Sequence, residues 1–142
     1  MHNLEQDILM DTHIWIWLME GNPILADSKV LSMIEQAAES GILSVSAISV
    51  WEIGMLEAKI RISFTVPCME WIHKALSIPG LQLAPLTPEI AIESTRLPGN
   101  FHGDPADRII TATARLNNTI LITKDKKILE YAKSGFLKAI GI

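Results

Sequence analysis

Residues 8–20 of the chain are Ile8-Leu9-Met10-Asp11-Thr12-His13-Ile14-Trp15-Ile16-Trp17-Leu18-Met19-Glu20. The first three form a short apolar run that is typical of a buried strand, and Asp11 ends it. The residues from Thr12 to Glu20 predict a helix, which the sequence Gly21-Asn22-Pro23 ends. A buried strand that passes directly into a helix is typical of α/β folds, so we expect strands and helices to alternate in the rest of the chain.

The alternation continues to the C-terminus. Further strands are predicted over 42–45, 81–83 and 119–123, with a last edge strand over 136–140. Helices are predicted over 28–40, 47–59, from Pro67 through Leu76, from Thr87 to before Pro98-Gly99, over 105–117 and over 126–133. Strands separated by helices predict a three-layer αβα fold with a central, mostly parallel sheet of about four to five strands.

Length and composition set the broad class of the protein. A chain of 142 residues fits one domain, 1–142, and 49% hydrophobic residues are enough for a packed core. The longest apolar run, Ile14 to Met19, is too short to span a membrane, and the acidic segment 1–7 does not resemble a signal peptide. The single cysteine, Cys68, excludes an internal disulfide framework and favours a cytoplasmic protein.

Four acidic residues fall at one predicted edge of the sheet. Asp11 directly follows the first strand, and Asp125 lies two residues beyond the last clear strand. Glu52 lies in an otherwise apolar helix that follows the second strand, and Asp107 lies in the first turn of the helix that begins at Pro105. Because ligands of open α/β sheets bind beyond the carboxyl ends of the strands, these four side chains are the candidate site.

Each acid also has a purely structural interpretation. Asp11, Asp104 and Asp125 are good helix caps, Asp107 suits the positive end of a helix, and a lone acid such as Glu52 is usually exposed. Four acids at one edge nevertheless favour a metal site, because packed carboxylates repel one another unless a cation is present. Oxygen ligands without histidine or cysteine favour Mg²⁺ or Mn²⁺.

The histidines of the chain do not predict a metal site. His13, His73 and His102 are scattered and lack the spacing of a ligand motif. His102 precedes Gly103-Asp104, where it can approach the acids as a proton donor, although a histidine in a loop more often has no such role.

The charge of the chain has two interpretations. Twelve basic and sixteen acidic residues give a net charge of −4, which by itself argues against binding of nucleic acid. If four acids belong to one metal site, the remaining twelve balance the bases, so the distribution of charge matters more than its sum. The basic residues near Asp125 then form either a rim that contacts phosphates or a solvated helix start; they are Lys124, Lys126, Lys127, Lys133 and Arg108.

Four strings carry a family resemblance, and they occur in order along nearly the whole chain. They are Ile8-Leu9-Met10-Asp11-Thr12-His13, Ser49-Val50-Trp51-Glu52-Ile53, Asp104-Pro105-Ala106-Asp107-Arg108 and Leu121-Ile122-Thr123-Lys124-Asp125. Together they resemble the PIN-domain ribonucleases, and most closely the VapC-type toxins of bacterial type II toxin–antitoxin systems.

The resemblance implies a function for each string. Asp11, Glu52, Asp107 and Asp125 correspond to the acids that hold Mg²⁺ or Mn²⁺ for hydrolysis of an RNA phosphodiester. Thr12 and Thr123 correspond to hydroxyl residues that bind metal-ligated water or support a carboxylate. The family further implies a PIN-like fold and a cytoplasmic homodimer, inhibited by a VapB-type antitoxin whose tail enters the acidic groove.

The chain departs from the family pattern at Lys127. Many PIN domains carry Asp or Asn there, two residues after the last acid, so the number of metal ions is open and Asp104 is a candidate replacement. Arg108 matches a common position, where it either pairs with Asp104 or another acid or reaches the substrate phosphate.

Two other functions compete with the nuclease. One is a PIN-fold module that binds a partner and has no catalytic activity, which the lysine at position 127 leaves open. The other is a phosphatase with Asp11 as nucleophile, which in the haloacid-dehalogenase-like enzymes requires an acid at the position of His13.

Overall fold

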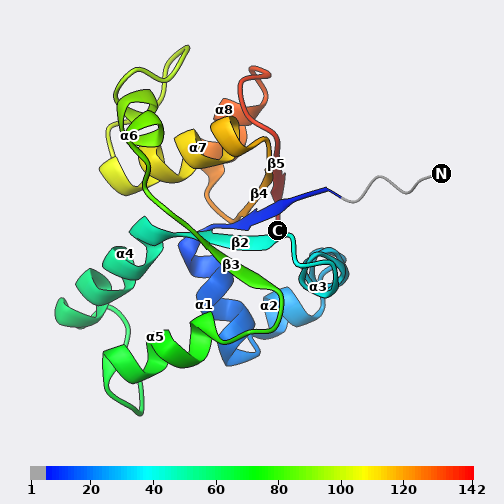
Figure 1. The fold of residues 1–142 in the computed structure, drawn as a ribbon, viewed down its shortest axis with the longest axis vertical. Coiled ribbons are helices and arrows are strands. Elements are labelled where there is room, and N and C mark those ends of the chain that lie inside the picture. Colours follow the sequence, from blue (N-terminus) through cyan, green and yellow to red (C-terminus); the bar gives the residue numbers. More distant parts are fainter. Residues whose placement is uncertain (1–5) are drawn as a thin grey trace.

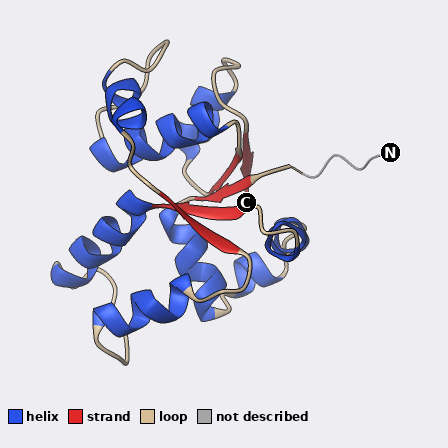
Figure 2. Ribbon diagram, viewed as in Figure 1, coloured by secondary structure: helices blue, strands red, loops and turns tan. Residues whose placement is uncertain are grey.

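The computed structural model describes residues 6–142 and contains a parallel sheet between two layers of helices (Figure 1 and Figure 2). Residues 1–5, which carry most of the acidic N-terminal segment, lie outside the described residues. The sheet has five strands in the order β3-β2-β1-β4-β5, and every neighbouring pair is parallel. The strands are β1 (Ile8–Met10), β2 (Leu43–Ser46), β3 (Leu81–Ala84), β4 (Ile120–Thr123) and β5 (Ala139–Gly141). The predicted α/β class and strand count are confirmed.

Helices cover both faces of the sheet. Figure 1 shows α1 to α5 on one side and α6 to α8 on the other. Their bounds are α1 (Thr12–Glu20), α2 (Pro23–Ala26), α3 (Val30–Glu39), α4 (Ala47–Ala58), α5 (Cys68–Leu76), α6 (Pro88–Thr95), α7 (Pro105–Asn117) and α8 (Lys126–Ala132). The predicted three layers are therefore present.

The central strand β1 contributes to two hydrophobic cores because its side chains alternate between the faces of the sheet. Ile8 and Met10 pack in the core that contains Trp15, on the side of α1. Leu9 packs in the core that contains Ile110, on the side of α7. A strand buried on both faces reads as a continuous apolar run, which is why residues 8–10 could be recognised from the sequence.

Polar caps start the helices at the carboxyl edge of the sheet. The side chains of Asp11, Ser46, Asp104 and Asp125 each accept a backbone N–H in the first turn of α1, α4, α7 and α8 respectively. Asp11 directly follows β1, Ser46 is the last residue of β2, and Asp125 lies two residues beyond β4, so strand ends and helix starts meet at one place. The fold thereby gathers acidic residues that are far apart in the sequence.

The structure corrects several predicted boundaries. Gly21-Asn22-Pro23 ends α1, but Asn22 also caps the short helix α2, which the sequence did not predict. Helix α3 begins at Val30 instead of Ser28, whose hydroxyl accepts the Val30 N–H. The last strand covers Ala139–Gly141 instead of 136–140, and Pro67 precedes α5 instead of opening it.

No helix within residues 6–142 is both long and apolar enough to cross a membrane.

Candidate metal centre

One cavity brings the predicted acids together. It has a volume of about 300 Å³, lies at the carboxyl edge of the sheet and is lined by Asp11, Glu52, Asp104, Asp107 and Asp125. His13, Lys124 and Lys126 complete its lining. The topology thus places the four acids as expected and adds Asp104 to them.

Asp11 lies deepest among these acids, with only 6% of its surface exposed. Its Oδ1 accepts the Thr12 N–H at 2.8 Å, and its Oδ2 accepts the Thr123 hydroxyl at 2.6 Å. The Thr123 oxygen in turn accepts the Asp125 N–H at 2.9 Å. Asp11 therefore caps α1, and Thr123 holds both the Asp11 carboxylate and the backbone N–H of Asp125.

Glu52 is held by a second, separate hydroxyl. The Thr12 hydroxyl donates to Glu52 Oε1 at 2.5 Å, and the Ser49 hydroxyl lies 2.8 Å from the Thr12 oxygen. Because Thr12 has a single hydroxyl proton, which points to Glu52, Ser49 donates to Thr12. Thr12 and Thr123 thus support carboxylates, as the family resemblance implied. Ser49 is a positioning residue that the sequence did not single out.

Asp104 and Asp125 combine capping with lining of the cavity. Asp125 Oδ1 accepts the backbone N–H groups of Lys127 and Ile128, and Asp104 Oδ1 accepts that of Ala106. Each cap uses one carboxylate oxygen, so the second oxygen remains for another partner. The capping and ligand interpretations of these residues are therefore compatible.

His102 also belongs to this site. Its Nε2 lies 2.8 Å from Asp107 Oδ2, and its ring stacks on Phe101 with centroids 4.3 Å apart. His102, Asp107 and Asp125 each offer a ligand atom within 4.8 Å of the others. The histidine adds a nitrogen to the expected oxygen donors. The only sequence signal for it is its place just before Asp104.

Arg108 points away from the carboxylates. Its guanidinium donates to the carbonyl oxygens of Ser94, Phe101 and His102 at 2.8, 3.2 and 3.0 Å. Pairing with Asp104 or another acid, one of the two roles open from the sequence, is not among the Arg108 contacts within residues 6–142. Arg108 instead ties the loop that carries His102 to helix α7.

Burial shapes the electrostatics of the cavity. Burial raises the pKa of Asp11, and it raises the pKa of Glu52 to about 7 and that of Asp107 to about 6. The charges of neighbouring carboxylates raise these pKa values further. Burial also lowers the pKa of His13, with a further contribution from Lys124. The site is therefore costly to ionise in the absence of a cation, and its donor set fits a divalent metal ion.

Comparisons with known proteins identify the family. Residues 8–134 match the family model of the PIN domain. The chain belongs to the PIN domain family. It is 33% identical over 121 residues to the ribonuclease VapC22 of Mycobacterium tuberculosis (strain H37Rv). The matched region covers 85% of this chain and 88% of that protein.

Solved structures share the fold of this PIN domain. VapBC2 from Rickettsia felis, bound to a DNA fragment of its promoter, matches with a TM-score of 0.68 and 15% identity, over 94% of this chain and 97% of the other. FitAcB from Neisseria gonorrhoeae matches with a TM-score of 0.62 and 20% identity, over 94% and 96%. A toxin–antitoxin complex from Klebsiella pneumoniae matches with a TM-score of 0.56 and 25% identity, over 85% and 89%.

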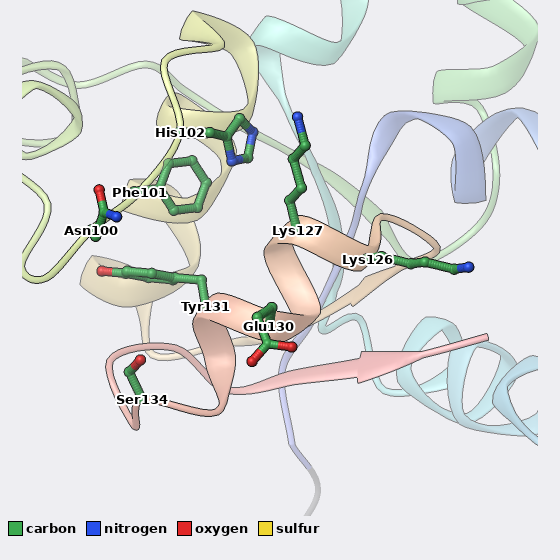
Figure 3. A pocket seen from close by; sticks show the side chains of 8 residues that line it. All are labelled: Asn100, Phe101, His102, Lys126, Lys127, Glu130, Tyr131 and Ser134. Atoms are coloured by element: carbon green, nitrogen blue, oxygen red, sulfur yellow. The ribbon is translucent and has the colours of Figure 1, made fainter.

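A second, open pocket of about 490 Å³ adjoins the acidic cavity of the PIN domain. Figure 3 shows its lining, in which His102 and Lys127 approach from facing elements. Lys124 and Lys126 line the acidic cavity, and Lys126 and Lys127 line the open pocket, so these three lysines are placed as the predicted rim requires. The other two residues of the expected rim lie elsewhere. Lys133 lies at the far end of α8 beside Glu130, and Arg108 binds carbonyl groups.

The Thr123 hydroxyl allows a test of how the PIN-domain acids are positioned. Thr123→Val removes a partner from both Asp11 and the Asp125 N–H, so we expect affinity for Mg²⁺ or Mn²⁺ to fall about 10–100-fold. The free energy of unfolding should fall by about 1–3 kcal/mol because buried polar groups lose their partners. Calorimetric metal titration and urea unfolding measure the two effects.

Two controls separate position from packing. Thr123→Ser keeps the hydroxyl and should bind metal nearly as well as the unmodified protein. Thr111→Val removes an equally buried hydroxyl that has no hydrogen-bond partner within residues 6–142, and should cost neither stability nor metal affinity. Unchanged metal affinity in Thr123→Val would show that the hydroxyl does not position Asp11.

Proposed function

We propose that the protein is a metal-dependent endoribonuclease that acts as the toxin of a toxin–antitoxin pair. The observation that carries the proposal is the partly buried acidic cavity, in which five carboxylates converge at the carboxyl edge of the sheet. The 33% identity to the ribonuclease VapC22, over most of both chains, supports RNA as the substrate. The region 1–142 then forms a single PIN domain.

The residues of the site have different roles in phosphodiester hydrolysis. Asp11, Glu52, Asp107 and Asp125 would hold Mg²⁺ or Mn²⁺, which when bound would neutralise phosphate charge and lower the pKa of the attacking water. Thr12 and Thr123 fix the orientation of Glu52 and Asp11 through the hydrogen bonds described above. Fixed donors reduce the reorganisation needed when charge develops during the reaction.

The lysine rim guides the RNA. The exposed ammonium groups of Lys124, Lys126 and Lys127 surround a cavity lined by acids, where they can contact the phosphates that flank the cleaved bond. Such contacts give affinity without sequence readout. They also explain how a chain with a net charge of −4 can bind a polyanion.

The proposed partner is a VapB-type antitoxin that inhibits a homodimer of this chain in the cytoplasm. The toxin–antitoxin complexes among the solved structures of the same fold support this partner. The acidic cavity would accept a basic side chain from such an inhibitor, because a cation reduces the repulsion among the carboxylates just as a metal ion does.

The two competing functions are less well supported. A binding module has no need of buried carboxylates that are costly to ionise, yet the predicted acids are all present in one cavity. A phosphatase would need Asp11 to attack a phosphate, but both of its oxygens accept hydrogen bonds and little of the residue is exposed.

RNA cleavage under metal control tests the proposal. We expect the purified protein to cut a mixed-sequence single-stranded RNA with Mg²⁺ or Mn²⁺, to stop in excess EDTA and to recover when metal is added back. Gel analysis of the fragments measures all three conditions. Cleavage that persists in EDTA would overturn metal dependence, and intact RNA under every metal condition would overturn the nuclease.

A further inference from the structure

We propose that His102 is itself a metal ligand in this centre, together with Asp107 and Asp125, and that it favours a transition-metal ion over Mg²⁺. This inference rests on the proposed function, because it assumes that an ion occupies the acidic cavity. It adds a nitrogen donor to a site whose predicted ligands are all oxygen atoms. The His102 nitrogen lies in the same part of the site as Asp125 and Lys127. The lysine stands where many PIN domains carry an acidic or amide ligand.

The spacing of the donor atoms suits shared coordination. A hydrogen bond of 2.8 Å joins His102 Nε2 to Asp107 Oδ2, and a ligand atom of Asp125 lies within 4.8 Å of both. A metal ion bound by both atoms would take the place of the proton between them. Two ligands about 2.1 Å from one ion and at right angles to each other are about 3.0 Å apart. The histidine and Asp107 therefore already have the separation of neighbouring ligands.

Aromatic packing and hydrogen bonds hold the His102 ring in this orientation. It stacks on Phe101, which is 9% exposed and packs edge-to-face against Tyr131 with centroids 4.8 Å apart. Arg108 binds the carbonyl oxygens of Phe101 and His102. Helix α7 thus carries both Asp107 and the arginine that fixes the histidine loop, which gives Arg108 a positioning role.

The donor chemistry of the cluster predicts its preferred metal. Asp125 uses Oδ1 to cap α8, so its other oxygen is the one left for coordination. Mg²⁺ strongly prefers oxygen ligands, whereas an imidazole nitrogen raises affinity for first-row transition metals. A site with one nitrogen and several carboxylates should therefore bind Mn²⁺ more tightly than Mg²⁺, and the histidine should account for part of the difference.

Bound Mn²⁺ provides the test, because its unpaired electrons report the nuclei of its ligands. We expect electron spin echo spectra of the full chain with Mn²⁺ to show coupling to an imidazole ¹⁴N nucleus. His102→Asn should remove this coupling and lower Mn²⁺ affinity about 10-fold in calorimetry, while Mg²⁺ affinity changes much less. His13→Asn is the matched control, because His13 lines the same cavity but lies outside the three-residue cluster.

The outcomes separate this inference from the proposed function. Coupling that survives in His102→Asn, or that disappears in His13→Asn, overturns the assignment. Mn²⁺ binding without nitrogen coupling in the unmodified chain also overturns the assignment of His102, but it is consistent with a metal centre of carboxylates alone. Failure of the unmodified chain to bind Mn²⁺ overturns both. Should His102→Asn not fold, ¹⁵N-histidine labelling of the unmodified chain shows whether the coupled nitrogen belongs to a histidine, and loss of the coupling in His13→Asn overturns the assignment to His102.

Discussion

Replacing Asp11 by Asn is expected to lower RNA cleavage by about 10³-fold or more while the protein remains folded. Asp11 is the most deeply buried acid of the cavity, and both of its oxygens are fixed by hydrogen bonds. Under the proposed function, loss of this carboxylate removes a metal ligand from the site, and a metal ion contributes several kcal/mol to stabilising charge in the transition state. About 4 kcal/mol corresponds to a 10³-fold change in rate.

The stability of Asp11→Asn should change in the opposite direction to its activity. The amide oxygen can still accept the Thr12 N–H and cap α1, and the amide NH₂ can donate to the Thr123 oxygen in place of the bond that Asp11 accepts, so the fold loses little. Burial raises the pKa of Asp11, so without metal the carboxylate is a cost that the amide does not carry. We therefore expect unfolding in urea with EDTA to show a stability at least equal to that of the unmodified protein, and addition of Mg²⁺ to stabilise the variant much less.

Asp27→Asn is the matched control for this substitution. Asp27 is an exposed residue at the end of α2, outside the cavity, so the same chemical change there should leave cleavage and metal response unchanged. Cleavage by Asp11→Asn within 10-fold of the unmodified protein would contradict the assignment of Asp11 as a metal ligand. Global unfolding of the variant in EDTA would contradict the argument from burial.

The sequence predicted the placement of the acids because strand ends and helix starts carry strong local signals. Asp11 follows a fully apolar strand, and Asp104-Pro105 is a cap followed by a residue that favours the first helical turn. Once the sheet is parallel, these signals alone bring Asp11 and Asp125 to one edge. Glu52 and Asp107 follow because each lies near the start of a helix that begins at that edge.

The parts that the sequence did not predict depend on side-chain contacts that residue spacing does not encode. His102 meets Asp107 only because Arg108 and Phe101 fix the preceding loop, and no residue spacing encodes that arrangement. Ser49 reaches Thr12 across the interface between α4 and α1. The contacts of the Arg108 guanidinium could not be predicted either, because backbone carbonyl groups that accept a guanidinium have no residue-specific signature.

Glu52→Gln is expected to make the metal-free protein more stable than the unmodified chain above about pH 7, and not below about pH 4.5. Burial raises the pKa of Glu52 from 4.5 to about 7. Between these values the folded protein holds a proton that the unfolded chain has released, so the contribution of Glu52 to stability is lost as the pH rises. The amide of the variant does not ionise, and the difference should reach about 1–2 kcal/mol after allowance for the partial exposure of the side chain.

Metal should reverse the order of the two proteins. In the proposed site Mg²⁺ binds the ionised Glu52 carboxylate, so the stabilising effect of Mg²⁺ on the unmodified chain should grow between pH 5 and pH 8. Glu52→Gln lacks this carboxylate and should respond less. Urea unfolding at intervals across this range, with EDTA or with Mg²⁺, measures both effects. Glu57→Gln, on the same helix but outside the cavity, is the control. If the stabilities of Glu52→Gln and the unmodified chain run parallel from pH 5 to pH 8 in EDTA, then Glu52 ionises as freely as a surface carboxylate, and its part-buried hydrogen bond to Thr12 does not prepare it for a metal ion.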